Sequence, residues 1–174
     1  ICMRNKGFGR IVMATAVICE FNPFHNGHKY LLESAKNVLK EPAIAIMSGS
    51  FTQRGEVAVC DKFVRAKSAL ENGADLVLEL PVVFSLSGAE GFAKAGVAIA
   101  SAFECTNHLA FGSESGDCEL LKKSANAVCD ERVQALVRDG MKNGGYYPRE
   151  LENAVKTVFG DEISSVLCEP NNIL

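Results

Sequence analysis

Short apolar runs punctuate the first two thirds of the chain at regular intervals. They are rich in Ala, Val, Ile and Leu, and each is bounded by Gly, Pro, Asn or charged residues, which is typical of the buried strands of a parallel sheet. The runs occupy residues 11–20, 43–47, 76–80 and a last stretch that closes at 109–111. The pattern therefore predicts four inner strands.

Amphipathic stretches lie between these runs and predict helices. Residues 29–39 repeat apolar positions at helical spacing, and the side expected to face inward carries Tyr30, Leu31, Leu32, Ala35, Val38 and Leu39. Asp61 is a good N-cap for a helix to residue 72 that Gly73 closes. Ser87 is expected to cap a helix of small residues that runs to about residue 103 and packs closely on the sheet.

From residue 118 onward the pattern is helical throughout. Helices are expected near 118–129, 131–143 and 149–159, separated by Gly144-Gly145 and Pro148. Strands that alternate with helices form a parallel sheet through right-handed crossovers. We therefore predict a three-layer α/β domain with a parallel sheet and a helical C-terminal part.

Unusual polar residues gather in the loops that follow the predicted strands. In parallel α/β sheets, ligands bind beyond the carboxyl ends of the strands. Here those loops are residues 21–28, 48–56, 81–87 and 112–117, and the third is apolar enough to form the wall of a pocket. Their convergence on one edge indicates a ligand site there.

The first of these loops carries two histidines, His25 and His28, with Gly27 between them. A helix N-terminus has unpaired N–H groups and a partial positive charge, so it attracts phosphate. Imidazole donors at such a turn favour the handling of a nucleoside triphosphate. The pair could instead cap the helix or form part of a metal site. A zinc site is disfavoured because His108 is the only other histidine and no Cys-x-x-Cys pair is present, so no metal ligands are assigned.

Composition narrows the class of protein. The chain has 174 residues, 48% of them hydrophobic and 22% charged, which is typical of a globular domain. Its net charge of −3 includes no basic run, so any RNA must be held mainly by other parts of the protein. Seven irregularly spaced cysteines, with Cys19 and Cys60 as buried or loop thiols, indicate a reducing compartment, and we expect a cytoplasmic protein. No run has the length of a membrane span and no signal peptide is recognisable, so no membrane partner is expected.

Six ordered sequence blocks resemble one known family. The blocks are EFNPFHNGH, MSGSFTQRGE, the helix start with Asp61-Lys62 and Arg65, NGADLVLELP, FGSES and PNNIL. Together they resemble the bacterial tRNA(Met) cytidine acetate ligase family, within the HIGH-type nucleotidyltransferase superfamily. The resemblance covers residues 13–174 and implies a Rossmann-like nucleotidyltransferase fold. Since Met13 precedes the first strand, residues 1–12 are expected to be an upstream extension. Residues 13–174 are expected to be an ATP-binding domain that is truncated at its C-terminus.

The resemblance also implies an activity. Such an enzyme activates acetate with ATP, accompanied by Mg²⁺, to acetyl-adenylate. It then acetylates N4 of the wobble cytidine of elongator tRNA(Met), which is bound mainly through a C-terminal portion beyond Leu174. His25 and His28 would be catalytic, stabilising charge on the triphosphate as pyrophosphate leaves. By the same resemblance, ATP would contact Ile18, Cys19, Glu20, Phe21, Asn22, Pro23, Phe24, His25, Asn26, Gly27, His28, Lys29, Tyr30, Leu31, Gly112 and Asn171, or Asn172 in place of Asn171.

Several polar residues keep two interpretations. Ser48, Gly49, Arg54 and Lys62 are possible substrate contacts, but Arg54 and Lys62 could equally pair with Glu56 and Asp61. Glu20 could orient a histidine or a ribose, or make a structural hydrogen bond. We expect Glu114 and Asp117 to be loop and cap residues and His108 to be structural.

Two other functions stay open at this point. An adenylyltransferase of cofactor biosynthesis shares the His-x-Gly-His turn, although it has no reason to carry the SGSFTQRGE and FGSES blocks. A non-catalytic nucleotide-binding module would bind ATP without turning it over. The sequence predicts no particular oligomeric state.

Overall fold

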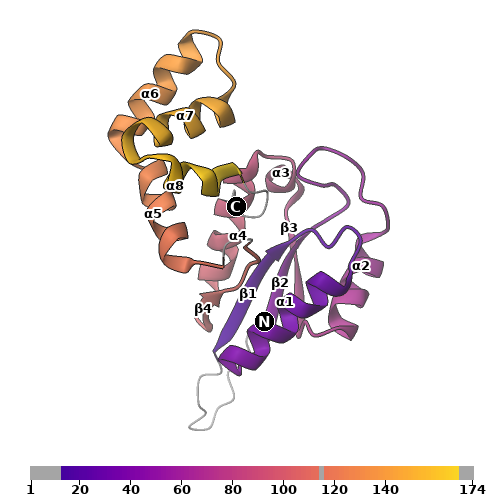
Figure 1. The fold of residues 1–174 in the computed structure, drawn as a ribbon. Coiled ribbons are helices and arrows are strands. Elements are labelled where there is room, and N and C mark those ends of the chain that lie inside the picture. Colours follow the sequence, from indigo (N-terminus) through magenta and orange to yellow (C-terminus); the bar gives the residue numbers. More distant parts are fainter. Residues whose placement is uncertain (1–12, 114–115, 169–174) are drawn as a thin grey trace. The chain divides into compact units, whose positions relative to one another are not determined.

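Four parallel strands form one sheet in the computed structural model, which describes residues 13–113 and 116–168 (Figure 1). The strands are β1 (Ala14–Cys19), β2 (Ala43–Ser48), β3 (Leu76–Leu80) and β4 (Thr106–Leu109). Their order in the sheet is β3-β2-β1-β4, so β1 and β2 are central. The predicted parallel sheet is confirmed.

Helices cover both faces of this sheet. The helices α1 (Asn26–Leu39) and α2 (Lys62–Glu71) pack on one face, where Leu32 and Ala69 are fully buried against the strands. The helix α4 (Ala89–Ala102) covers the other face, and a single turn, α3 (Val82–Ser85), precedes it. The three-layer α/β class is therefore confirmed.

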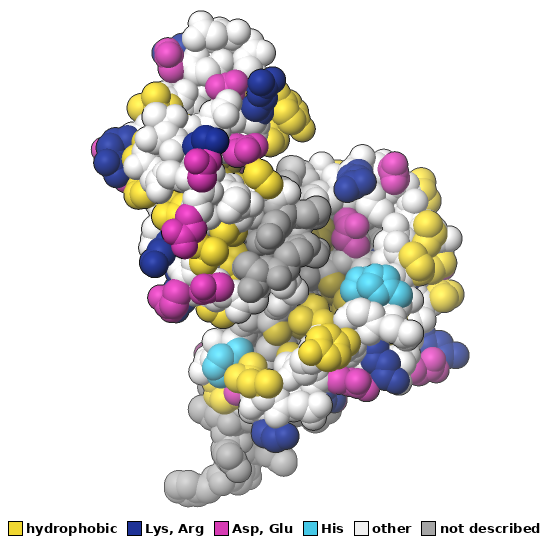
Figure 2. Space-filling view, in the orientation of Figure 1, with side chains coloured by type: hydrophobic (Ala, Val, Ile, Leu, Met, Phe, Trp, Pro, Cys, Tyr) yellow, Lys and Arg dark blue, Asp and Glu magenta, His cyan; other side chains and the backbone are white. Residues whose placement is uncertain are grey.

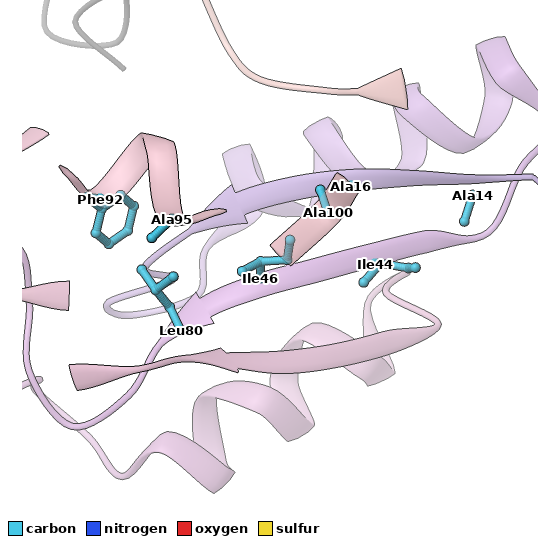
Figure 3. Packing of buried hydrophobic residues seen from close by; sticks show 8 residues of the cluster. All are labelled: Ala14, Ala16, Ile44, Ile46, Leu80, Phe92, Ala95 and Ala100. Atoms are coloured by element: carbon cyan, nitrogen blue, oxygen red, sulfur yellow. The ribbon is translucent and has the colours of Figure 1, made fainter. Parts of the chain in front are cut away.

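The two cores follow from the alternation of side chains along each strand. Small and branched residues of β1, β2 and β3 meet α4, as Figure 3 shows for Ala16, Ile46 and Leu80 beside Phe92 and Ala95. The strands are in register, so that Ser48 lies opposite Leu80 at the carboxyl ends of β2 and β3. Small side chains on α4 and on the strands let the helix approach the sheet closely.

The chain divides into two compact units, residues up to 111 and residues from 112. The second unit is helical, with a core of Ala127, Val133, Val137, Ala154 and Val155. Asp117 caps its first helix by accepting hydrogen bonds from the N–H groups of Glu119 and Leu120, as expected. Its elements are α5 (Cys118–Val128), α6 (Glu131–Lys142), α7 (Tyr147–Phe159), α8 (Asp161–Ser165) and the 3₁₀ helix η1 (Val166–Cys168). The last two were not predicted.

Local details of the first unit differ from the sequence-based expectation. Tyr30 and Val38 do not face inward but are 73% and 78% exposed, because α1 buries only a narrow stripe through Leu32 and Ala35. Ser87 does not cap α4; its hydroxyl donates to the carbonyl of Phe84, and Gly88 is the N-cap. The helix α1 also begins earlier than expected, at Asn26.

Two further differences concern the loops at the carboxyl edge. The apolar loop after β3 is not irregular throughout, because its residues form α3. The strand β4 ends at Leu109, two residues before the expected end, although the N–H of Ala110 still donates to the carbonyl of Ala16. No helix in the described ranges 13–113 and 116–168 has the length and apolarity needed to cross a membrane.

Gly96 lets α4 pack closely on Ile18 of β1. A Cβ atom at this position would lie 2.6–2.8 Å from three side-chain carbons of Ile18. Real Cβ contacts are not that short, so a larger residue must displace either the Ile18 side chain or α4. The layer spacing in this part of the unit thus depends on the absence of a side chain at residue 96.

We predict that Gly96→Val lowers the free energy of unfolding by about 1–3 kcal/mol, the usual cost of overpacking a core. Ala98→Val on the same helix is the control, because Ala98 is exposed and only a helix-propensity cost of about 0.5 kcal/mol is expected there. Urea denaturation of the two variants measures the difference. Equal stability of the variants would show that α4 can shift freely on the sheet.

Candidate functional site

His25 and His28 form a reciprocal cap at the N-terminus of α1, just beyond the carboxyl end of β1. His25 is the N-cap, and its Nδ1 accepts a hydrogen bond from the N–H of Gly27 at 3.1 Å. The Nδ1 of His28 accepts from the N–H of His25 at 3.3 Å. The two imidazole rings stack, with centroids 3.6 Å apart. Both imidazoles therefore satisfy helix N–H groups that otherwise have no partner.

This cap determines the tautomer of both rings. A neutral imidazole has one acceptor nitrogen and one N–H donor. Since Nδ1 of each ring is the acceptor, the proton of each neutral ring is on Nε2. The turn consequently presents two Nε2–H donors from rings that lie one on the other, and histidine side chains reach the surface in the space-filling view (Figure 2).

His28 is held in the neutral form. Burial lowers the pKa of His28 from 6.5 to about 4, and the charge of the adjacent His25 acts in the same direction. The burial comes from Phe21 and Phe24, whose ring centroids lie 4.8 and 5.7 Å from that of His28. At neutral pH, His28 is thus a hydrogen-bond donor without a positive charge.

The turn itself is anchored by Phe21. Its φ of 48° is in the left-handed region, which few non-glycine residues adopt, and its side chain is 1% exposed. The buried ring and its edge-on contact with Phe24, at 5.0 Å between centroids, hold this conformation. Asn22 ties the turn to the next loop by accepting a hydrogen bond from the N–H of Val59 at 2.8 Å.

Arg65, on α2, is buried beneath the strand ends with 1% of its surface exposed. Its Nη1 donates to the carbonyls of Glu20 at 2.6 Å and Ser48 at 3.2 Å, and its Nη2 donates to the carbonyl of Gly49. Its Nε donates to the carbonyl of Cys60 at 3.2 Å. One guanidinium thus joins the ends of β1 and β2 to the loop that follows β2.

The charge of Arg65 has no close counter-ion among the described residues, since its acceptors are neutral carbonyls. The Arg65 charge acts on the Cys19 thiol and lowers its pKa. Burial of the thiol has the larger, opposite effect, so the pKa of Cys19 is well above its ordinary value. The Cys19 thiol is therefore protonated at neutral pH and is not a nucleophile.

Two of the open interpretations can now be compared with the structure. The Oε1 of Glu20 accepts a hydrogen bond from the N–H of Gln53 at 2.6 Å, which corresponds to the structural alternative. Lys62 pairs with neither Asp61 nor Glu56; its Nζ contacts both carboxylate oxygens of Glu79, at 2.8 and 2.7 Å. Asp61 instead caps α2 through the N–H of Phe63, as predicted.

The other possible substrate contacts differ in exposure. Ser48 and Gly49 are buried at the end of β2, and a Cβ at Gly49 would collide with the carboxylate of Glu79. Arg54 is exposed and forms no ion pair with any residue in the described part of the chain. Of these residues, Ser48 and Gly49 lie within the Arg65 network.

The residues expected to contact ATP differ in how deeply their side chains are buried. Ile18, Cys19 and Leu31 pack into the two cores of the sheet, whereas Tyr30 is exposed and Lys29 makes an ion pair with Glu33. A Cβ at Gly27 would lie 3.0 Å from the His25 ring, so this glycine makes room for the cap. The first turn of α1 starts at Asn26, after the exposed Pro23 and the half-buried Phe24.

The remaining assigned residues lie elsewhere. Gly112 is exposed and begins the second unit, and Asn171 and Asn172 lie outside the described residues, as does Glu114. His108 is in β4, as expected, and its Nδ1 lies 3.0 Å from Glu41. Within residues 13–113 and 116–168, no group of three His, Cys, Asp or Glu side chains is placed to hold a metal ion.

The sequence pattern alone assigns Arg65 no role of its own. The signal that could have found it is its spacing: Arg65 lies four residues before Ala69, on the apolar stripe by which α2 faces the sheet. A charged residue on the buried stripe of a helix needs several partners. What no local pattern reveals is that these partners are carbonyls from two different strands.

A comparison with known families now places the chain. The sequence profile described as HIGH Nucleotidyl Transferase matches residues 12–174. The chain belongs to this family. The resemblance drawn from its sequence blocks is thereby confirmed at the level of the family.

Curated relatives share about two fifths of their length with the chain. A tRNA(Met) cytidine acetate ligase from Lysinibacillus sphaericus is 42% identical over 166 residues, which are 92% of this chain and 41% of the relative. The protein of the same name from Bacillus subtilis is 40% identical over 92% of this chain and 39% of its own length. The crystal structure of Thermotoga maritima TmcAL bound with alpha-thio ATP has a TM-score of 0.86 and 40% identity, covering 92% of this chain and 41% of that one.

We predict that Arg65→Met destabilises the chain by several kcal/mol, because each buried carbonyl left without a donor costs roughly 1–3 kcal/mol. The matched control is Arg54→Met, which removes an exposed guanidinium from the neighbouring loop and should change stability by less than about 0.5 kcal/mol. Urea denaturation compares the two. If both variants unfold at the same urea concentration, the Arg65 network does not hold the strand ends together.

The His28 imidazole should titrate with a pKa of about 4 in the folded chain and near 6.5 in the denatured chain. Between these values the unfolded chain binds the proton more readily. Stability should therefore fall as the pH drops from about 6.5 to about 4, and His28→Gln should weaken this dependence. Histidine NMR spectra recorded across the acidic and neutral range report the titration. A folded-state pKa near the ordinary histidine value would contradict the neutral-donor assignment.

Proposed function

We propose that this chain is the acid-activating part of a tRNA(Met) cytidine acetate ligase. The complete enzyme would use ATP to convert acetate to acetyl-adenylate. It would then transfer the acetyl group to N4 of the wobble cytidine of elongator tRNA(Met), which forms N4-acetylcytidine. The observation that carries the proposal is the pair of Nε2–H donors at the N-terminus of α1, in a chain about 40% identical to proteins of that name.

The activation step needs stabilisation of negative charge. A carboxylate oxygen of acetate attacks the α-phosphorus of ATP, and the bond from that phosphorus to the oxygen bridging the β-phosphate breaks. Pyrophosphate leaves with the electron pair of that bond. Charge grows on the leaving phosphates, and preorganised donors aimed at them lower the barrier.

His25 and His28 would provide those donors. Each is fixed by its own cap hydrogen bond, at 3.1 and 3.3 Å, so neither ring must reorient when ATP arrives. The low pKa of His28 keeps the ring uncharged near neutral pH, with its Nε2–H as the donor. The positive end of the α1 dipole acts on the phosphates in the same direction.

The nucleotide would enter with its own metal ion. The Thermotoga maritima protein has alpha-thio ATP bound in its crystal structure, which supports ATP as the nucleotide here. Since the described residues offer no three-ligand carboxylate or histidine cluster, Mg²⁺ would be held by the phosphates and by water. The residues of this chain would then bind and orient the triphosphate.

The transfer step depends on parts of the protein outside this chain. The N4 amine of cytidine attacks the acyl carbon of acetyl-adenylate, AMP leaves, and the amine loses a proton. The net charge of −3 argues against a strong grip on tRNA by these 174 residues, since RNA affinity rests on contacts of Lys and Arg with phosphates. We therefore expect tRNA to be held by the remainder of a protein of the relatives' length.

We predict that the full-length protein catalyses acetate-dependent exchange of pyrophosphate into ATP, and that His28→Ala slows this exchange about 100-fold or more. The loss of the cap should cost only about 1 kcal/mol of stability, so the variant stays folded. The measurement is incorporation of labelled pyrophosphate at saturating acetate and ATP.

His108→Ala is the matched control, because this exposed histidine on β4 bonds to Glu41 and should leave exchange unchanged. Exchange that requires nicotinate or pantetheine phosphate derivatives would assign the protein to cofactor biosynthesis. ATP binding without exchange under any of these conditions would identify a non-catalytic nucleotide-binding module.

A further inference from the structure

One cation at the carboxyl edge of the sheet has no partner. Most lysines and arginines of the first unit contact a carboxylate or a carbonyl, namely Lys29, Lys36, Lys62, Lys67, Lys94 and Arg65. Among residues 13–111 the side chains of Lys40 and Arg54 have neither. Lys40 ends α1 beside Pro42, whose carbonyl bonds to the start of β1, so it lies at the amino edge of the sheet. Arg54 is thus the cation that remains available near the proposed site.

Arg54 is held at the tip of a tight hairpin. Phe51 and Val57 form an antiparallel bridge, and the N–H of Gly55 donates to the carbonyl of Thr52 at 3.0 Å. The φ of Gly55 is 81°, in the left-handed region, as is usual for a hairpin turn that ends in a glycine bulge. The backbone that carries Arg54 is therefore fixed, while its side chain is exposed.

This hairpin is attached to the histidine turn. The N–H of Gln53 donates to Glu20 Oε1 at 2.6 Å, and the N–H of Val59 donates to Asn22 Oδ1 at 2.8 Å. Glu20 and Asn22 belong to the segment that leads from β1 to the cap at His25. Figure 1 shows the loop between β2 and α2 at the same end of the sheet as the start of α1. A substrate bound at the histidine turn would thus lie next to the hairpin.

The outer face of the hairpin is apolar. Side chains alternate between the two faces of a strand, and Thr52 is buried against the rest of the unit. Phe51, Val57 and Val59 share the opposite face, and all three are exposed. Several exposed apolar side chains next to a reaction site indicate a binding surface.

The charge around Arg54 is balanced. Glu56 is exposed on the same hairpin, and Glu20 bonds to the neighbouring Gln53. Neither forms an ion pair with Arg54 in the described part of the chain, but both offset its charge at longer range. The hairpin therefore does not attract a polyanion from a distance. Its guanidinium can make a directed contact with a phosphate that other parts of the protein bring to it.

The proposed transfer step determines which molecule meets this surface. The N4 amine of cytidine is on the base-pairing edge, so the base must be unpaired and turned out of its stack. An RNA loop that presents such a base also presents unstacked neighbouring bases and backbone phosphates. Apolar side chains can contact the bases and a guanidinium the phosphates. The phosphates of ATP, in contrast, are already served by the histidine donors and the N-terminus of α1 in the proposed activation step.

We propose that the hairpin of residues 50–59 is the surface on which the target loop of the tRNA docks. Arg54 binds a backbone phosphate beside the cytidine, and Phe51, Val57 and Val59 contact unstacked bases. This inference deepens the proposed function and rests on it. The remainder of the protein still holds most of the tRNA, whereas the hairpin orients the cytidine toward the histidine turn.

The test compares two reactions of the full-length protein: acetate-dependent pyrophosphate exchange, which needs no tRNA, and acetylation of an elongator tRNA(Met) transcript. Arg54→Met should lower kcat/KM for tRNA about 10- to 100-fold, the range expected for a hydrogen bond to a charged group. Exchange should be unchanged, because no RNA takes part in it. The KM for tRNA should also depend less steeply on salt, since one phosphate contact is lost.

Val57→Asp tests the apolar face. It should likewise lower kcat/KM for tRNA, because a carboxylate there repels phosphate, and it should leave exchange and the Tm unchanged. The matched controls are Lys40→Met, which removes the other unpaired cation, and Val38→Asp, since Val38 is 78% exposed and Val57 73%. Both control residues lie at the far end of α1, so neither substitution should affect acetylation of tRNA.

The proposal is overturned if either hairpin variant acetylates tRNA with the normal kcat/KM. It is also overturned if Arg54→Met slows exchange as much as acetylation, because the guanidinium then binds ATP. A marked fall in the Tm of full-length Val57→Asp would show that another part of the protein covers this face, which excludes RNA from it. If the unmodified protein shows no acetate-dependent exchange, or transfers no acetyl group to tRNA, the proposed function itself has failed.

Discussion

The carboxyl edge of the sheet depends on the hydrogen bonds that the buried Arg65 guanidinium donates to backbone carbonyls. Parallel strands end with carbonyls that have no partner within the sheet, and burying them without donors is costly. Arg65 supplies donors to the ends of β1 and β2 and to both ends of the loop between residues 49 and 60. The loops that carry Asn22, Ser48 and Gln53 take their positions from these strand ends. A lysine could not replace it, because a single ammonium cannot reach four carbonyls in fixed directions.

The two histidines combine a structural task with a chemical one. Their Nδ1 atoms complete the N-terminus of α1, and the same two bonds leave the proton of each neutral ring on Nε2. Packing of Phe21 and Phe24 on His28 removes water from the ring and keeps it neutral. The structural interpretation, a helix-capping pair, and the catalytic interpretation are therefore compatible, since the cap is what preorganises the donors.

Periodicity and turn residues predicted the layers of the fold well. The apolar runs marked the strands, and Asp61 and Asp117 marked helix starts, because these signals are local. The errors have non-local causes. Tyr30 and Val38 are exposed because the sheet covers only part of α1, and Ser87 bonds to the preceding turn instead of to α4.

The candidate site could be predicted only in part, because some of its contacts are also non-local. The His-x-Gly-His turn is contiguous, so its position at a strand end was readable from the sequence. Arg65 acquires its role from contacts with residues up to 45 positions away in the sequence, which no spacing rule encodes.

If this sheet edge joins a carboxylate to the α-phosphorus of ATP, an oxygen atom must pass from the acid to the nucleotide. The full-length protein would be incubated with ATP, tRNA and acetate labelled with ¹⁸O in both carboxylate oxygens, and the products analysed by mass spectrometry. When acetyl-adenylate forms and its acetyl group moves to tRNA, the AMP released carries one ¹⁸O atom. Unlabelled AMP, or label in inorganic phosphate together with ADP, would contradict this chemistry.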